Sequence, residues 1–129
     1  MSSIKTYTDL KQSKILAEIL SHNTADQTYE RVAISGANLD IPEEMQYRHS
    51  DVQFKFYSGI GVPCWSLAAL IDVLPEQFGR YTKTLYWFDD AWHCEYVDKD
   101  SEGKYGVTAD DSVDVCVKMI TKLKENNLL

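Results

Sequence analysis

The segment from Val62 to Pro75 constrains the fold more than any other, because a proline lies near each of its ends. Pro63 disfavours the helical conformation for the preceding residue, so the chain should enter the segment extended. Ser66 is a candidate N-cap, and Pro75 cannot continue a helix without losing a hydrogen bond. Between them, four apolar residues have the spacing of one helix face: Leu67, Leu70, Ile71 and Leu74. The segment therefore predicts a short buried helix with fixed ends.

Cys64 and Trp65 lie just before this helix, and two interpretations of them are open. In the first, Trp65 folds back onto the apolar face of the helix and both residues belong to the core. In the second, they line a pocket and the Trp65 ring stacks on a small ligand. The second interpretation makes Cys64 and Trp65 candidate binding residues.

The residues from Thr82 to Val97 alternate as in a β-hairpin whose turn is Asp89-Asp90. This register pairs Trp87 with Trp92, Leu85 with Cys94, and Lys83 with Tyr96. It places on one face the apolar side chains that we expect in the core: Leu85, Trp87, Trp92, Cys94 and Tyr96. A longer, four-residue loop is an alternative, because Asp-Asp is a weaker turn signal than Asn-Gly.

The opposite face of the hairpin is mixed and includes three ring-bearing residues, Tyr86, Phe88 and His93. If no helix covers it, this face is an exposed aromatic patch, and such patches mark binding sites for partners. Tyr86, Phe88 and His93 are therefore candidate residues for partner binding.

The remaining elements follow from apolar periodicity and capping residues. We expect a helix from its N-cap Thr8 to Leu20, a strand from Tyr29 to Ser35, a helical turn around Glu43 to Tyr47, a half-buried strand from Val52 to Tyr57, and a last helix from Thr108 to about Asn126. That last helix would begin at a capping box formed by Thr108 and Asp111. Its buried stripe comprises Val113, Cys116, Ile120 and Leu123.

At 129 residues, the chain is long enough for one core, and we expect a single globular domain over residues 1–129. Helices at both ends and before the hairpin predict an α+β fold. In this fold about three helices pack on a small, mostly antiparallel sheet with the β-hairpin at its centre.

The formal net charge of −7 argues against direct binding of nucleic acid, because a phosphate backbone would be repelled. Three widely spaced cysteines, Cys64, Cys94 and Cys116, favour free thiols in a reducing compartment. The first residues lack the apolar core of a signal peptide, and no apolar run reaches the ~18 residues of a membrane span. We therefore expect a cytoplasmic protein without membrane association.

No motif for catalysis, a metal ion or a cofactor stands out, and we expect none of the three. The residues from Asp98 to Gly103 match the start of a calcium-binding loop, but Ala109 stands where that loop needs a bidentate carboxylate. A solvated turn is the favoured interpretation of this segment. A catalytic pair of Cys64 with His93 stays open, because such pairs form in space and not along the sequence.

Four short motifs are distributed along the chain: Gln12-Ser13-Lys14 with Leu16, Thr24-Ala25-Asp26 with Tyr29, Pro63-x-Trp65-Ser66-Leu67-x-x-Leu70 with Leu74-Pro75, and Trp92-x-Cys94-x-Tyr96. Together with the last helix, they resemble an uncharacterised family of small proteins from gut Bacteroides-type genomes, prophages and mobile elements. The stretch from Gly36 to Tyr57 departs from that pattern. The resemblance implies a compact α+β fold and a phage or mobile-element setting, and it implies no activity and no functional residues.

Two hypotheses about function follow. The leading one is a non-enzymatic accessory protein of a phage or mobile element, which binds a host or phage protein through an acidic or aromatic surface. The alternative is a small-molecule-binding domain or weak hydrolase with a pocket near Trp65. A DNA-mimicking inhibitor comes last, because the acidic residues are interspersed with lysine and arginine. Association into a homo-oligomer stays open.

Overall fold

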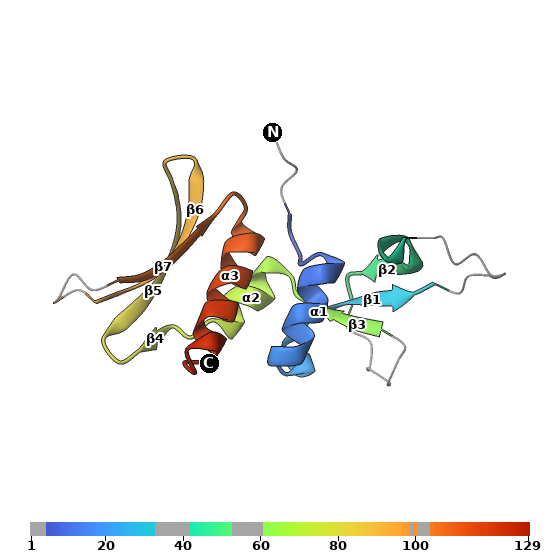
Figure 1. The fold of residues 1–129 in the computed structure, drawn as a ribbon, viewed down its shortest axis with the longest axis horizontal. Helices are drawn as coiled ribbons and strands as arrows, with labels where there is room; N and C mark the ends of the chain where they lie inside the picture. The colour runs from blue at the N-terminus through green and yellow to red at the C-terminus, as the bar shows by residue number, and fades with distance from the viewer. Residues whose placement is uncertain (1–4, 33–41, 53–60, 99, 101–103) are drawn as a thin grey trace. The chain divides into compact units, whose positions relative to one another are not determined.

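The computed structural model describes residues 5–32, 42–52, 61–98, 100 and 104–129. Its contacts group into two compact units, which are labelled by their elements in Figure 1. We call Thr8–Ser66 the three-stranded unit, and Met1–Tyr7 together with Leu67–Leu129 the hairpin unit. The predicted α+β class is confirmed, but the strands form two antiparallel sheets where one was expected. A single domain over residues 1–129 stays a prediction.

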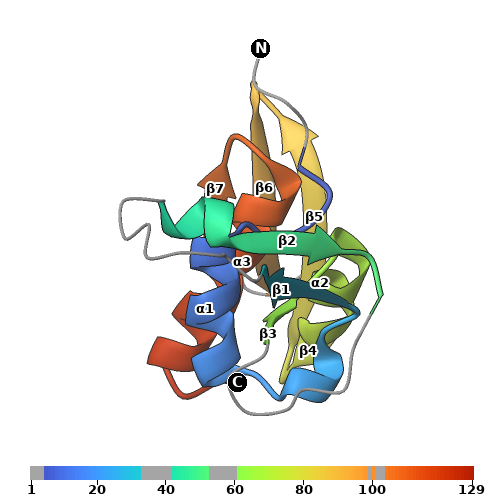
Figure 2. The same cartoon turned by 90° about the vertical axis from the view of Figure 1, so that its right-hand side faces the viewer.

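The described residues of the three-stranded unit form one α-helix, two short 3-10 helices and a small sheet. Its elements are α1 (Leu10–Ile19), η1 (His22–Thr24), β1 (Gln27–Arg31), η2 (Glu43–Gln46), β2 (Tyr47–Ser50) and β3 (Gly61–Cys64). The strand order is β2-β1-β3, so β1 pairs with both neighbours, as Figure 2 shows. Helix α1 packs against β3. The core of this unit includes Leu10, Leu16, Ala25, Cys64 and Trp65.

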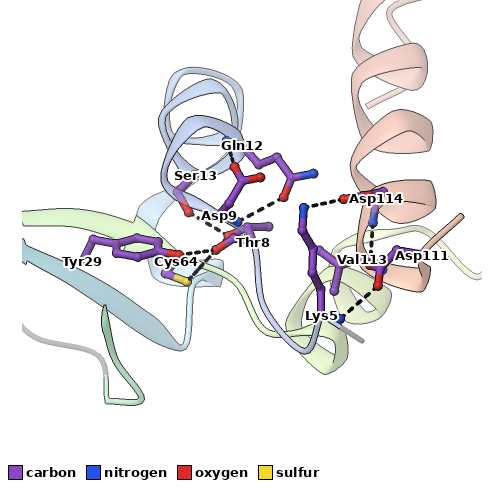
Figure 3. Close-up of polar contacts among 10 residues, drawn as sticks. All are labelled: Lys5, Thr8, Asp9, Gln12, Ser13, Tyr29, Cys64, Asp111, Val113 and Asp114. Carbon is purple, nitrogen blue, oxygen red and sulfur yellow. Dashed lines mark hydrogen bonds and ion pairs between the residues drawn. The ribbon is translucent and has the colours of Figure 1, made fainter. Parts of the chain in front are cut away.

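Helix α1 begins later than its predicted N-cap Thr8 because Asp9 caps it. The Asp9 carboxylate accepts a hydrogen bond from the Gln12 backbone N–H at 2.7 Å, and the Gln12 side chain accepts one from the Asp9 N–H at 3.1 Å (Figure 3). This reciprocal capping box satisfies two donors that a helix end leaves free. The Thr8 hydroxyl is instead buried and bonds the Ser13 hydroxyl at 2.7 Å.

The middle of this unit differs from expectation in two places. The helical turn expected around Glu43 to Tyr47 is present as η2, but the strand β2 that follows it was not foreseen. The strand predicted from Val52 to Tyr57 lies outside the described residues except for Val52 itself, which is exposed and follows β2 in a bend. The first strand was predicted from Tyr29 to Ser35, but β1 begins at Gln27 and ends at Arg31. Residues 33–35 of the predicted strand are not among the described residues.

The hairpin unit contains a four-stranded sheet and two helices. Its elements are α2 (Leu67–Val73), β4 (Gln77–Phe78), β5 (Tyr81–Phe88), β6 (Ala91–Asp98), β7 (Lys104–Ala109) and α3 (Ser112–Glu125). The strand order is β4-β5-β6-β7, and α3 packs on β6, β7 and α2. Leu70 and Leu74, from the predicted short helix, are buried, and so is the whole predicted stripe of α3.

The predicted hairpin is confirmed in its register. Trp87 pairs with Trp92, Leu85 with Cys94, and Lys83 with Tyr96. Asp89 and Asp90 form the two-residue turn with positive φ angles of 53° and 59°. Positive φ at both central positions is the signature of a type I′ turn, whose twist matches that of the paired strands. Aspartate adopts this conformation more readily than most residues, which explains how a turn without glycine closes here.

Helix α3 begins four residues later than predicted, because Thr108 belongs to β7 and pairs with His93. The N-cap is Asp111, whose carboxylate accepts hydrogen bonds from the backbone N–H groups of Val113 at 2.8 Å and Asp114 at 3.3 Å. Its other oxygen accepts from the Lys5 backbone N–H at 3.0 Å (Figure 3). Asp111 thus joins the start of the chain to the start of the last helix.

We expect Asp111→Ala to lower the free energy of unfolding by about 1–2 kcal/mol, because three backbone donors lose their acceptor. Urea unfolding followed by circular dichroism measures this change. Asp110→Ala is the matched control, since Asp110 is exposed and immediately precedes the cap. Equal stability of the two variants would contradict the assignment of Asp111 as the cap.

Candidate functional site

The mixed face of the hairpin is exposed, as its candidate role requires. We call Tyr86, Phe88 and His93 the aromatic face. Phe88 is 66% exposed and Tyr86 36% exposed, which places both among the exposed large apolar side chains of the described residues. Helices α2 and α3 lie on the other side of this sheet in Figure 1, where the Tyr96 hydroxyl donates to the Pro75 carbonyl at 2.6 Å. The described helices of the hairpin unit therefore leave the aromatic face open to solvent.

The three rings of the aromatic face hold one another in place. The Tyr86 and His93 rings are stacked, with centroids 4.9 Å apart and planes 4° apart. The Phe88 ring is tilted against the His93 ring, with the two centroids 6.3 Å apart. The His93 Nε2 atom also lies 3.0 Å from the Phe88 carbonyl oxygen. These contacts reduce the freedom of exposed rings, so less entropy is lost when a partner binds them.

Glu95 supports the aromatic face from within the sheet. Its nearly buried carboxylate accepts a hydrogen bond from the Tyr86 hydroxyl at 2.8 Å and forms an ion pair with Lys104 Nζ at 2.9 Å. Burial alone would raise the pKa of Glu95, but the Lys104 and Tyr86 hydrogen bonds outweigh it and the pKa lies below its ordinary value. Gly106 leaves room for this carboxylate, since an added Cβ would lie 3.0 Å from Glu95 Cγ.

The lowered pKa of Glu95 predicts a dependence of stability on acidic pH. A carboxyl group whose folded pKa is depressed stabilises the fold above its unfolded pKa, and this contribution is lost as the pH falls through the folded value. We expect the wild type to lose more stability than Glu95→Gln when the pH falls below the ordinary value of 4.5. Urea midpoints of both proteins between neutral and acidic pH measure the difference. Parallel pH profiles would contradict the role of the Glu95 ion pair.

The opposite hairpin face is only partly the core that the sequence predicts. Cys94 and Tyr96 are fully buried, but Trp87 is 52% exposed, so its predicted core position is wrong. Trp87 lies near the turn, opposite Trp92, which is the residue closest to the turn at which β6 pairs with β7. Both views show the turn projecting beyond α3 (Figure 1, Figure 2). The end of the hairpin therefore carries exposed rings on both of its faces.

Cys64 and Trp65, the second candidate set, lie inside the three-stranded unit. Both residues have no exposed surface. The Trp65 Nε1 atom donates to the Thr24 hydroxyl at 2.9 Å, and the Trp65 backbone N–H donates to the Thr8 hydroxyl at 3.2 Å. These contacts match the core-packing interpretation. A role in ligand binding stays a prediction.

The surroundings of Cys64 are polar, and none of the described residues places a base in contact with the thiol. Its sulfur lies 3.6 Å from the Thr8 hydroxyl, as Figure 3 shows, and 3.8 Å from the Gln27 side-chain oxygen. Burial raises the pKa of Cys64 to about 11, so the thiol is protonated at neutral pH. His93 belongs to the other unit, and its pairing with Cys64 stays a prediction.

Each unit also has a surface groove. The groove of the three-stranded unit, about 590 Å³, is lined by α1 and η2, and includes Lys14, Ile15 and Glu43. The groove of the hairpin unit, about 480 Å³, lies beside Phe78, Tyr81 and Leu128. Neither groove includes Cys64, Trp65 or the aromatic face among its lining residues.

The described residues contain no group of three or more metal-binding side chains. Of the segment from Asp98 to Gly103, for which a solvated turn is predicted, Lys99 and residues 101–103 lie outside the described part, while Asp98 accepts a hydrogen bond from the Asp100 N–H at 2.9 Å. No helix in the described part of the chain has both the length and the apolar character to cross a membrane.

The aromatic face could be proposed from sequence, but the ion pair beneath it and the exposure of the neighbouring Trp87 could not. Alternation alone places Tyr86, Phe88 and His93 together, whereas the Glu95–Lys104 ion pair depends on β7, which was not predicted. The exposure of Trp87 depends on where β7 and α3 end. No protein-family model, curated protein or solved structure matches the chain.

Proposed function

We propose that this chain is a non-enzymatic binding protein that engages a protein partner through the aromatic face. The observation that carries this proposal is the exposure of Phe88 and Tyr86 on an ordered hairpin. Aromatic residues dominate the binding energy of protein interfaces, because they bury a large area with few rotatable bonds. The resemblance described above adds an accessory role in a phage or mobile element, with a host or phage protein as the partner.

The chemistry of the cysteines supports a binding role over a hydrolase. A cysteine nucleophile needs a lowered pKa, which an exposed and electropositive setting provides. Burial here raises the pKa of Cys64 and Cys94 to about 11 and that of Cys116 to about 12. All three thiols are buried and protonated at neutral pH, so they serve as core residues.

Affinity capture with three tagged proteins tests the proposal. The wild type, Phe88→Ala and Met45→Ala are each incubated with lysate of a gut Bacteroides-type host, and bound proteins are identified by mass spectrometry. Met45→Ala is the matched control, because Met45 is 71% exposed and lies in the other unit. We expect one stoichiometric partner with the wild type and with Met45→Ala, and its loss with Phe88→Ala. A partner retained equally by all three would overturn the assignment of the aromatic face.

A further inference from the structure

The two edges of the four-stranded sheet differ in how far their outward backbone groups are hydrogen-bonded. Strand β7 forms one edge, and two lysines of α3 donate to its outward carbonyls: Lys118 to Thr108 at 2.9 Å and Lys122 to Gly106 at 3.2 Å. Exposed strand edges are templates for further pairing, and lysines along an edge are one means of blocking it. The β7 edge is therefore occupied by the protein's own side chains.

The other edge is covered over only part of its length. Strand β4 pairs with Tyr81 and Thr82, and the Lys83 N–H donates to the Glu76 carbonyl at 2.9 Å. Because hydrogen bonding alternates along an antiparallel strand, the N–H and C=O groups of Leu85 and Trp87 point outward in the same direction as the Lys83 N–H. No described strand pairs with β5 there. We call Thr84–Phe88 the open edge.

The open edge has the composition of a strand that pairs readily. Its sequence, Thr84-Leu85-Tyr86-Trp87-Phe88, contains only residues that favour or tolerate strands, with no charge and no proline. Trp87 is half exposed and Phe88 still more so. The charged residues and prolines by which proteins discourage edge pairing are thus absent from this stretch of β5.

Acidic side chains flank both ends of the open edge. Glu76 lies at one end with its side chain 86% exposed, and Asp89 and Asp90 are exposed at the other. Lys83 Nζ forms an ion pair with Glu76 at 3.1 Å and also donates to the Leu74 carbonyl at 3.1 Å, so the acidic charge offered to a partner is concentrated at Asp89 and Asp90. A net charge of −7 adds to the acidic character. The charge pattern matches an extended segment with basic residues at the end that lies beside Asp89 and Asp90.

We infer that the partner supplies an extended segment with lysine or arginine at the end beside Asp89 and Asp90, which adds to the open edge as a fifth strand. This inference rests on the proposed function, since it describes how the hairpin would hold its protein partner. Main-chain hydrogen bonds to Leu85 and Trp87 provide affinity in strand addition, while side-chain contacts provide specificity. The segment's side chains would lie beside Tyr86 on one face and Trp87 on the other.

Peptide binding tests the strand and the charge together. The probe is a fluorescent peptide library, Lys-Lys-X-Thr-X-Thr-X-Lys-Lys with X drawn from Val, Ile, Phe and Tyr, measured by fluorescence polarisation on the intact chain. The comparison library carries glutamate at both ends. We expect the lysine library to bind and the glutamate library to bind at least about tenfold more weakly at low salt. No binding of the lysine library, or equal binding of the two, would overturn the inference.

Two substitutions of Trp87 distinguish the contribution of its backbone N–H to peptide binding from the contribution of its side chain. Proline at an outward-facing edge position removes the N–H without breaking the β5–β6 pairing. We expect Trp87→Pro to bind the best lysine peptide about tenfold more weakly than Trp87→Ala, which keeps the N–H. Equal binding by these two folded variants would overturn strand addition.

N-methylated peptides apply the same test to the unaltered protein, should Trp87→Pro fail to fold. Methylation at one set of alternate residues should abolish binding, and methylation at the other set should leave it unchanged; equal effects would overturn strand addition. If the wild type has twice the expected mass in solution and Trp87→Pro is a monomer, the open edge binds a second copy of the chain. This result would overturn the inference of a basic partner segment. If the lysine peptides fail but partner capture still depends on Phe88, strand addition fails and the proposed function stands.

Discussion

Trp65→Ala should lower the free energy of unfolding by about 3–5 kcal/mol, the largest effect we expect from a single substitution. Trp65 has no exposed surface, so its removal leaves a cavity in a packed core. The Thr24 hydroxyl also loses the indole N–H that donates to it at 2.9 Å. Urea unfolding, followed by circular dichroism and compared with the wild type, measures the change.

Two further variants make this result interpretable. Trp87→Ala makes the same chemical change at a half-exposed position and should cost less than about 1 kcal/mol. Trp65→Phe keeps much of the ring volume and should fall between the two alanine variants. A loss below about 1 kcal/mol for Trp65→Ala would contradict the core role and favour the pocket that the sequence left open.

Phe88→Ala should weaken partner binding by about thirtyfold, which corresponds to about 2 kcal/mol, without a comparable loss of stability. Phe88 is 66% exposed, so the free protein loses little burial when its ring is removed. In a complex the same ring would be desolvated at the centre of the aromatic face. Isothermal titration calorimetry with the captured partner measures the affinity, and urea unfolding measures the stability.

Tyr86→Phe gives a second measure of the same face. This variant keeps the ring that stacks on His93 but removes the hydroxyl that donates to Glu95 at 2.8 Å. We expect a smaller loss of affinity than for Phe88→Ala, because the contact area is kept while the anchoring bond is lost. If Phe88→Ala binds the partner as tightly as the wild type does, the aromatic face is not the binding site, whatever the result for Tyr86→Phe.

The hairpin could be predicted from sequence because its information is local. Alternation over Thr82 to Val97 fixes the faces, and only one register sorts the side chains, so the pairing of Trp87 with Trp92 follows. The exposure of each side chain could not be predicted in the same way, because it depends on elements that are distant in sequence. Helices α2 and α3 cover the end of the hairpin near Tyr96 but do not reach Trp87, and nothing in the local pattern distinguishes these two positions.

Helix starts and short strands were harder to predict for a similar reason. Thr8 and Thr108 are acceptable N-caps by type, yet Asp9 and Asp111 cap the two helices in their place. The threonines have other roles, since Thr8 bonds Ser13 and Thr108 pairs with His93. Strand β7 has no clear alternation, so its presence, and with it the Glu95–Lys104 ion pair, could be found only from the structure.

Hydrogen exchange of the chain with and without its captured partner, read by mass spectrometry, tests the central claim most directly. Binding at the aromatic face predicts slower exchange in peptides that cover β5 and β6, with peptides from α1 and β1 unchanged, because amides at a bound surface exchange more slowly. Protection confined to the three-stranded unit, with β5 and β6 exchanging as in the free protein, would contradict it.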